Sequence, residues 1–397
     1  MKRFLLQLAL LFPFIGYAIY SYAQTDPNLV ITSFPLYWKF QEYMWQIGYH
    51  MRSTSVVIYA ALIVACLLSF WGMRWLKNNE RLGVFGAVMI VLMFAHNALS
   101  HDIFNYMFNA KMVLQYGLNP HIRVALDVPG DEWLRFMHNT HTPAPYGYGW
   151  TALSLLPSLL GGGKFVPTYM LYKLFMVLGV AVLFYAQQRL AKILKMEKEY
   201  WSHAWLLFLH PLFLIETVGN MHNDVWMIAF AFLSLWALIA AKQGRKLFCK
   251  HGFLAVGSFI ASVSIKLATV VLLPVGGVLL FDFKNKQWKF MKTYWAEISA
   301  LLLFLPLLTA RSQWFHPWYL IWSLSFVPFM RSKTVRAAFI GFSLAPLFRY
   351  IPYLLQGSFD GTVIQQEYLI TWVGGLVLAL CAVSISRFHL HKKTSNS

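Results

Sequence analysis

The sequence is poor in cysteine and in acidic residues. Its three cysteines are Cys66 and Cys381, which lie inside apolar runs, and Cys249, which lies in a basic loop. This distribution excludes an extracytoplasmic disulfide framework. Asp and Glu number only 15, and charged residues make up 12% of the chain, against about a quarter in ordinary soluble domains. The composition leaves no room for a soluble globular domain.

Long apolar runs make up most of the chain instead. Hydrophobic residues account for 58% of the 397 positions, and twelve runs are long enough, or nearly so, to cross a bilayer as helices. No fixed-period repeat or low-complexity linker divides the chain. We therefore expect an all-α polytopic membrane protein with about 12 transmembrane helices, folded as one membrane domain over residues 1–397. The runs lie at about 4–23, 53–73, 82–100, 166–187, 202–219, 223–241, 251–265, 267–282, 294–311, 316–330, 335–353 and 366–386.

The basic residues indicate the orientation. The formal net charge is +18, but Lys and Arg form short clusters between apolar runs rather than a basic face, which argues against nucleic-acid binding. Cytoplasmic loops of membrane proteins are enriched in Lys and Arg. The clustered side is therefore cytoplasmic, and we expect both termini there, in the plasma membrane. The clusters lie at 2–3, 74–81, 189–198, 242–250, 284–292, 331–336 and 387–393.

The first apolar run has a second interpretation. Phe4 to Ala23 follows a basic start and ends in small residues, as a cleavable signal peptide does. Its length of about 20 residues favours a retained membrane helix. In both cases the chain emerges on the outside at Gln24.

Residues 100–167 form the longest segment predicted to lie outside the membrane. Within it, the apolar stretch Trp150–Gly163 has only about 14 residues, too few for a confident span, and counting it as one would reverse every later loop. We expect it to be an interfacial or re-entrant helix. Functional residues concentrate in such segments.

Asp102 directly follows the third apolar run. The simplest interpretation is a charge that marks the end of a helix in water. The continuation from Met107 to Pro120 favours a functional role for Asp102 over this interpretation. An apolar stretch interrupted by polar residues is typical of an interfacial helix. At that depth a carboxylate stays ionised yet partly desolvated, as a general base requires.

A second polar cluster occupies the turn 216–224 between two apolar runs. A plain turn needs only Gly or Asn, whereas Glu216 lies about one helical turn inside the membrane edge, where a charge costs a few kcal/mol. His222 and Asp224 alone are too few for a spaced metal motif. We expect a binding role for this turn, and neither a metal nor a cofactor.

Three cations lie on the outer side, against the prevailing charge asymmetry: Lys266, Arg311 and Arg349. They are explained either as snorkelling side chains at helix ends or as donors to a lipid-linked phosphate. Aromatic turns accompany them at 143–150 and 312–319. These rings suit either an interface belt or a groove for lipid and sugar.

Several of these segments resemble the GT-C superfamily of membrane glycosyltransferases, nearest the bacterial polyprenyl-phosphate-mannose-dependent mannosyltransferases. The resemblance rests on the order and common outer placement of short motifs over residues 82–330 rather than on one diagnostic sequence. The motifs are Asp102 with Tyr106 and Gly117-Leu118-Asn119-Pro120, Pro145-Tyr146-Gly147, His210-Pro211 leading to Glu216, Gly219-Asn220-Met221-His222-Asn223-Asp224, Ser264-Ile265-Lys266-Leu267 and His316-Pro317-Trp318-Tyr319.

The resemblance implies a sugar, mannose or another hexose, carried on a polyprenyl phosphate and moved to a glycan, lipid or protein acceptor at the outer face. An outer-loop aspartate would activate the acceptor hydroxyl, and here it would be Asp102. The family usually places this acid in the first outer loop, so Asp26 and Glu42 are rivals. Residues expected to bind the donor phosphate are Lys266, Arg311 and Arg349. Those expected to bind the substrates are Tyr106, Asn119, Tyr146, Glu216, His222, Asn223, Asp224, His316, Trp318 and Tyr319.

Two other classes of protein remain possible on the sequence alone. A secondary transporter or lipid-linked-sugar flippase would also bury charges among about twelve helices, but near the midplane. A non-catalytic scaffold would give Glu216, Asp224 and Lys266 no purpose. The polar residues gather at the outer helix ends, which favours the transferase.

The orientation gives the first testable prediction. A cysteine introduced by Asp131→Cys should react with an impermeant thiol reagent added outside intact cells, and one introduced by Lys286→Cys should not. The positive-inside rule places these positions on opposite sides of the membrane. The reverse labelling pattern would overturn the orientation and move Asp102 to the cytoplasmic side.

Overall fold

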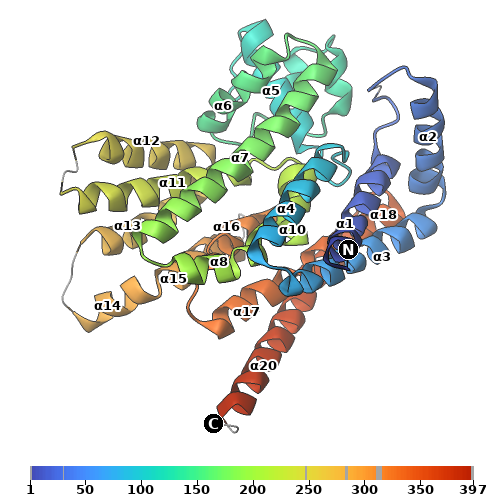
Figure 1. Cartoon of the computed structure of the whole chain (residues 1–397). Helices are drawn as coiled ribbons and strands as arrows, with labels where there is room; N and C mark the ends of the chain where they lie inside the picture. The colour runs from blue at the N-terminus through green and yellow to red at the C-terminus, as the bar shows by residue number, and fades with distance from the viewer. Residues whose placement is uncertain (1, 30, 246–247, 282–284, 310–314, 395–397) are drawn as a thin grey trace.

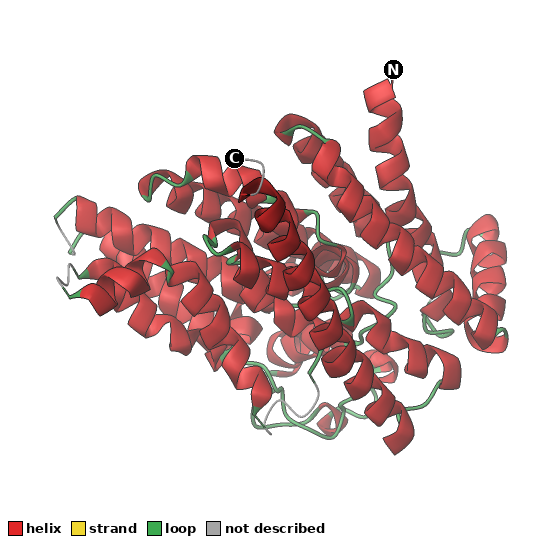
Figure 2. Ribbon diagram, turned by 90° about the horizontal axis from the view of Figure 1, so that it is seen from below, coloured by secondary structure: helices red, strands yellow, loops and turns green. Residues whose placement is uncertain are grey.

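The computed structural model describes residues 2–29, 31–245, 248–281, 285–309 and 315–394. Within these ranges the regular elements are all helical, and Figure 2 shows helices and loops alone. The predicted all-α fold is therefore confirmed. The helices and helical turns are α1 Lys2–Tyr20, η1 Ser21–Gln24, α2 Pro35–Trp45, η2 Gln46–His50, α3 Arg52–Gly72, η3 Met73–Trp75, α4 Asn78–Met93, α5 Asp102–Tyr116, η4 Ala125–Asp127, η5 Glu132–Phe136, α6 Tyr148–Leu160, α7 Phe165–Ile193, α8 Glu197–His203, α9 Trp205–Phe208, α10 Pro211–Leu214, η6 Ile215–Gly219, α11 Asp224–Gln243, α12 Lys250–Ile265, η7 Leu267–Leu272, α13 Leu273–Leu280, α14 Lys286–Thr293, α15 Trp295–Phe304, η8 Leu305–Leu308, η10 Pro317–Tyr319, α16 Leu320–Leu324, η11 Val327–Phe329, α17 Lys333–Phe342, η12 Pro346–Tyr350, α18 Ile351–Gln356, α19 Gly361–Leu369, η13 Ile370–Gly374 and α20 Gly375–Thr394.

Six helices in the described ranges are long and apolar enough to cross a membrane. A seventh span forms if the pair Lys286–Thr293 and Trp295–Leu308, bent by 77°, is counted as one. Two further apolar helices, Lys250–Ile265 and Leu267–Leu280, are shorter. The chain thus has the helices of a membrane protein, while the expected number of twelve stays a prediction. The six spans are Lys2–Gln24, Arg52–Trp75, Phe165–Ile193, Asp224–Gln243, Lys333–Gln356 and Gly361–Phe388.

Two of the remaining predicted runs fold as broken helices. The run at 202–219 is divided among α8, α9, α10 and η6, and the run at 316–330 among η10, α16 and η11. Pro211 and Pro317 each begin one of these short pieces, and Pro328 is the second residue of another, because proline lacks the N–H that a continuing helix needs. Both segments are almost wholly buried, which is the condition under which interrupted helices are tolerated at membrane depth.

The segment 100–167 caps one end of the long helix α7. Figure 1 shows α5 and α6 together beside the start of α7, while α20 runs toward the opposite side of the molecule. α5 confirms the helix expected after Asp102, and it ends at Gly117, whose φ of 63° is the left-handed conformation of a helix C-cap. α6, which runs from Tyr148 to Leu160, overlaps the stretch Trp150–Gly163, and its interfacial or re-entrant placement stays a prediction. These helices position Asp102 at the boundary between the cap and the bundle.

The burial of Asp131 makes it unsuitable as the outer position for cysteine labelling. Asp131 is only 8% exposed, and its carboxylate lies 2.6 Å from the Lys111 ammonium. A cysteine there would be shielded and would leave Lys111 unpaired. The outer label therefore belongs on the neighbouring Glu132, which is exposed.

The aromatic loop 143–149 docks on the end of α12. The Gly147 amide donates to the Ile265 carbonyl at 3.0 Å, and a Cβ at Gly147 would lie 2.0 Å from the Ser264 carbonyl oxygen. Only glycine permits this approach, which brings Tyr146 beside Lys266.

Gly147→Ala should therefore push the loop off α12. Overpacking of this kind costs about 1–3 kcal/mol, so we expect a lower melting temperature for the purified protein. Gly257→Ala is the matched control. Gly257 lies on α12, the helix on which the loop docks, and a Cβ there meets nothing within 4 Å. Equal stability of the two variants would show that the loop does not depend on this contact.

Candidate active site

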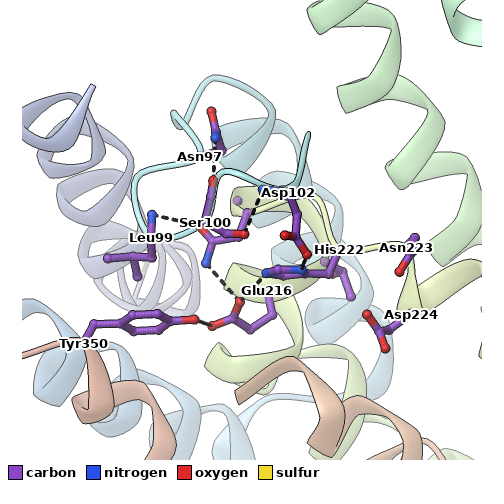
Figure 3. Close-up of polar contacts among 12 residues, drawn as sticks. Asn97, Leu99, Ser100, Asp102, Glu216, His222, Asn223, Asp224 and Tyr350 are labelled. Atoms are coloured by element: carbon purple, nitrogen blue, oxygen red, sulfur yellow. Dashed lines mark hydrogen bonds and ion pairs between the residues drawn. The ribbon is translucent and has the colours of Figure 1, made fainter. Parts of the chain in front are cut away.

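The His222 imidazole lies between two carboxylates. Its Nδ1 is 3.4 Å from Asp102 Oδ2, and its Nε2 is 3.3 Å from Glu216 Oε2. Figure 3 shows the three side chains in line, with the ring in the middle. Both distances are within the range of an ion pair, but neither ring nitrogen has the geometry of a hydrogen bond. The arrangement joins the start of α5 to the turn that precedes α11.

The Glu216 carboxylate is held from both sides. Tyr350 donates its hydroxyl to Oε1 at 2.9 Å, and Asn220 donates its amide to Oε2 at 3.0 Å. Glu216 belongs to η6, a single turn of π-helix, and such turns recur at functional sites. Because the side chain is completely buried, these donors replace the water that a carboxylate would otherwise need.

Lys173 supports the same turn from the middle of α7. Its buried ammonium donates to the carbonyls of Val218 at 3.1 Å and Gly219 at 2.8 Å. Neither Lys173 nor Tyr350 is among the site residues predicted from the sequence. For Lys173 the signal was available, since a lysine inside an apolar span is costly and usually has a specific partner.

Asp224 and Lys266 form a second ion pair. Lys266 Nζ lies 2.8 Å from both carboxylate oxygens of Asp224, and Trp322 donates its indole N–H to the same carboxylate at 2.5 Å. Asp224 opens α11 and Lys266 separates α12 from η7, so the pair fixes the ends of two helices against each other. Sequence reasoning did not identify Trp322, because a tryptophan in an apolar run gives no distinct signal.

Exposure separates the members of this cluster. The side chains of Asp102 and Lys266 remain 22% and 17% exposed, whereas His222, Glu216 and Asp224 are 0% exposed. A molecule approaching from outside thus meets one carboxylate and one ammonium. The three buried groups lie deeper in the protein.

Aromatic rings surround the exposed pair. Lys266 Nζ lies 6.0 Å from the ring centre of Tyr146 and 5.5 Å from that of Tyr319. Trp318 is stacked between two imidazoles, with ring centres 3.7 Å from His222 and 4.2 Å from His316. This stack fixes the plane of the His222 ring.

A second group of rings holds the other side of Asp102. Tyr106 packs edge-on against Tyr146 and Trp150, at 4.8 and 4.9 Å between ring centres, and its hydroxyl lies 3.5 Å from Asp102 Oδ2. The structure thus places Tyr106, Tyr146 and Trp318 around one centre, and their role in binding substrate stays a prediction.

The charges of Asp102 and His222 stabilise each other. Burial by itself raises the pKa of Asp102, but contact with His222 and the positive charges of His222 and Lys266 outweigh it and bring this pKa down to about 2. Burial also lowers the pKa of His222, yet the neighbouring Asp102 and Glu216 raise it overall above its usual 6.5. The cluster therefore favours an ionised Asp102 beside a protonated His222.

Asn223 supplies polar atoms without a partner in the described part of the chain. It is completely buried, and neither its side-chain oxygen nor its nitrogen makes a hydrogen bond there. Buried amides normally find partners. Its place between His222 and Asp224 marks a position where a bound hydroxyl would satisfy it.

Three further predicted site residues are Asn119, Arg349 and Arg311. Asn119 follows α5, whose last residue, Tyr116, is about 21 Å along the helix axis from Asp102 at 1.5 Å per residue, and it accepts from the His121 amide at 3.0 Å. Arg349 is buried in an ion pair with Glu367 at 2.8 Å and donates to the Phe315 carbonyl at 2.8 Å. Arg311 lies outside the described residues. The assigned roles of all three stay predictions.

The two rival acids are not part of the cluster. Asp26 accepts from the backbone and side-chain amides of Asn28 at 2.8 and 3.1 Å, and Glu42 is exposed on α2. Of Asp26, Glu42 and Asp102, it is Asp102 that contacts His222. The described residues include no group of three or more His, Cys, Asp or Glu side chains arranged for a metal ion, and the expectation of a metal-independent site stays an expectation.

Comparison with known proteins identifies relatives. A family described as alpha-(1->6)-mannopyranosyltransferase, N-terminal domain, matches residues 9–282. The alpha-(1->6)-mannopyranosyltransferase A of Corynebacterium glutamicum is 25% identical over 189 residues, which are 47% of this chain and 36% of the relative. The protein of the same name from Mycobacterium tuberculosis is 26% identical over 212 residues, 50% of this chain and 38% of the relative.

The matches therefore span less than two fifths of each relative's length. No solved structure gives a significant match. The family match includes Asp102, the turn 216–224 and Lys266, and it extends over more than half of the chain. It confirms the resemblance to GT-C membrane glycosyltransferases, and the chain belongs to the alpha-(1->6)-mannopyranosyltransferase family.

Proposed function

We propose that this protein is a membrane glycosyltransferase that moves mannose, or another hexose, from a polyprenyl-phosphate donor to an acceptor hydroxyl on the extracytoplasmic face. The observation that carries the proposal is the partly exposed pair of Asp102 and Lys266 beside an otherwise buried charged cluster. Direct transfer needs a base for the acceptor and a cation for the departing phosphate. The pair supplies one of each.

The reaction is a single displacement. The acceptor hydroxyl oxygen attacks the anomeric carbon while its proton passes to a carboxylate oxygen of Asp102. The bond from the anomeric carbon to the phosphate oxygen breaks, and its electron pair leaves with the lipid phosphate. The Lys266 ammonium, shared with Asp224 in the unliganded protein, stabilises the charge on that phosphate.

A base with a pKa of about 2 fixes the timing of proton transfer. Asp102 is ionised at neutral pH, but it is too weak to deprotonate a free sugar hydroxyl. Transfer becomes favourable once the new bond to the anomeric carbon has made the hydroxyl acidic. The barrier is therefore lowered mainly by positioning and by the cation at the phosphate.

His222 is a positioning residue in this scheme. Its ring holds Asp102 through one nitrogen and faces Glu216 through the other, and the stack with Trp318 prevents its rotation. The Asn223 amide, buried beside it, is suited to a sugar hydroxyl. The rings of Tyr146 and Tyr319 offer apolar faces at the same position.

The proposal includes the finer topology. About twelve spans, with broken helices among them, place residues 100–167 outside and both termini in the cytoplasm of a plasma-membrane protein with one membrane domain. The donor then reaches Asp102 along the outer leaflet, and the acceptor, a glycan, lipid or protein, arrives from outside. The positive clusters on the opposite side support this orientation.

A transporter or flippase for lipid-linked sugars is the second candidate function. The interrupted helices at 202–219 and 316–330 favour it, because transporters build their sites on such helices. Reconstituted vesicles distinguish the two. A transferase forms a new glycosidic bond from labelled donor and acceptor on one side, whereas a transporter moves unchanged donor across.

Asp102→Asn tests the base. The amide keeps the size of the side chain but cannot take a proton, so turnover should fall by about 10²–10⁴-fold while expression and donor binding persist. Asp26→Asn and Glu42→Gln are the matched controls and should retain activity. Loss of turnover in either control, with an active Asp102→Asn, would assign the base to the first outer loop.

Lys266→Ala tests the phosphate cation. Because the change alone would leave Asp224 buried and unpaired, it should be made in an Asp224→Asn background. We expect the double variant to lose about 10²–10³-fold in turnover with the polyprenyl-phosphate donor, relative to Asp224→Asn alone. Equal rates in the two proteins would return Lys266 to a purely structural role.

His222→Gln tests the positioning residue through pH. The raised pKa of His222 means that its cation is present below that pKa and is lost as pH rises through it, so activity should fall on the alkaline side. On the acidic side Asp102 stays ionised down to about pH 3, since its pKa is about 2. The Gln variant, neutral throughout, should have lower activity without the alkaline fall. An unchanged pH profile would contradict this role.

A further inference from the structure

A second polar hollow lies near the other end of α7. Its volume is about 250 Å³, and it is lined by Gln188, Arg189 and Lys192 of α7 and by Glu197, Tyr200 and Trp201 of α8. Lys173, which holds the active-site turn, is 16 residues from Arg189, or about 24 Å along the helix. The hollow is therefore separate from the Asp102 cluster, on the side that the basic residues mark as cytoplasmic.

The hollow contains two cations without carboxylate partners. Neither Arg189 nor Lys192 forms an ion pair within the described ranges of the chain. The Arg189 guanidinium lies 5.3 Å from the ring centre of Trp236 and 5.9 Å from that of Tyr185. These rings orient the guanidinium and supply no acceptor for its N–H groups.

A buried hydroxyl provides independent support for a ligand. Tyr200 is 0% exposed, and its hydroxyl has no hydrogen-bond partner among the described residues. Its ring is fixed by Trp201 and Phe329, at 5.5 and 5.3 Å between ring centres. A buried hydroxyl without an acceptor is costly, and the wall of this hollow is where an acceptor would satisfy it.

An apolar hollow adjoins the polar one, with Trp201 as a shared wall. Its lining includes Leu82 and Phe85 of α4, Phe184 of α7 and Phe208 of α9. These four side chains are suited to hydrocarbon, and the lining also includes the polar Asn78 and the cation Arg81. A ligand that fits both hollows carries a charged head and an apolar tail.

We propose that this pair of hollows is a binding site for a phospholipid of the cytoplasmic leaflet. Arg189 and Lys192 bind the phosphate, the Tyr200 hydroxyl donates to one of its oxygens, and an acyl chain lies against Phe85 and Phe184. Basic pockets between membrane helices on the cytoplasmic side commonly hold lipid head groups. The polar hollow carries two cations and one carboxylate, a net charge of +1 that a phosphodiester balances, and Arg81 in the lining of the apolar hollow adds a third cation.

Binding is measured on the full-length protein in detergent, by native mass spectrometry and by melting temperature, with added phosphatidylglycerol. Diacylglycerol with the same chains tests whether the tail alone suffices, and inorganic phosphate tests whether the head alone does. We expect bound lipid and a raised melting temperature with phosphatidylglycerol only. Equal stabilisation by diacylglycerol or by inorganic phosphate would overturn the assignment to a phospholipid.

Four variants test the individual contacts. Arg189→Gln with Lys192→Gln should weaken lipid binding by at least about tenfold, whereas Lys198→Gln, an exposed lysine outside the lining, should not. Tyr200→Phe should also weaken binding but raise the melting temperature of lipid-free protein, since it removes the unpartnered hydroxyl. Glu197→Gln should strengthen binding of the anionic lipid by removing a like charge. Unchanged affinity in the double variant, or equal loss in Lys198→Gln, would contradict the proposed site.

Discussion

Asp102, Glu216 and Asp224 bring three carboxylates into one largely buried centre, and their mutual repulsion has to be compensated locally. His222 provides this compensation for two of them, since its ring contacts Asp102 at 3.4 Å and Glu216 at 3.3 Å. Lys266 does so for Asp224. Breaking one buried pair while leaving its partner charged costs about 3–5 kcal/mol. The fold around the cluster is therefore constrained to keep every member of these contacts in place.

The interrupted helices follow from this constraint. A continuous helix through residues 202–219 would satisfy its own backbone but could not present both the Glu216 carboxylate and the adjacent carbonyls to the cluster. The π-turn 215–219 instead directs Glu216 toward His222, and Lys173 binds the carbonyls of Val218 and Gly219. The loop at Gly147 closes the same centre from outside by docking on α12. Backbone irregularity is thus confined to segments that the protein itself buries.

The sequence was informative where a residue type was costly at its position. Asp102, Glu216, His222, Asp224 and Lys266 are polar groups near apolar runs, and they do meet in one cluster. Their pairing could not be predicted, because the Lys266–Asp224 and His222–Asp102 contacts join positions far apart in the chain.

Residues with ambiguous chemistry were harder to interpret. Trp322 and Tyr350 look like ordinary interface aromatics until the structure shows their donors directed at carboxylates. Asn119 follows the helix of Asp102 in sequence, but its side chain accepts from the His121 amide and is not in contact with Asp102 in the described structure. The sequence predicts an accessible position at Asp131, but this residue is buried against Lys111. In each case the outcome depended on helix length or packing, which no local pattern encodes.

The most direct test of the account is a cryo-electron-microscopy structure with a non-transferable phosphonate analogue of a polyprenyl-phosphate mannose. The account predicts the phosphonate oxygens at hydrogen-bonding distance from Lys266 Nζ, and the sugar between Tyr146 and Tyr319 with its anomeric carbon facing Asp102. A head group bound away from this pair, on the cytoplasmic side of the 216–224 turn, would contradict it.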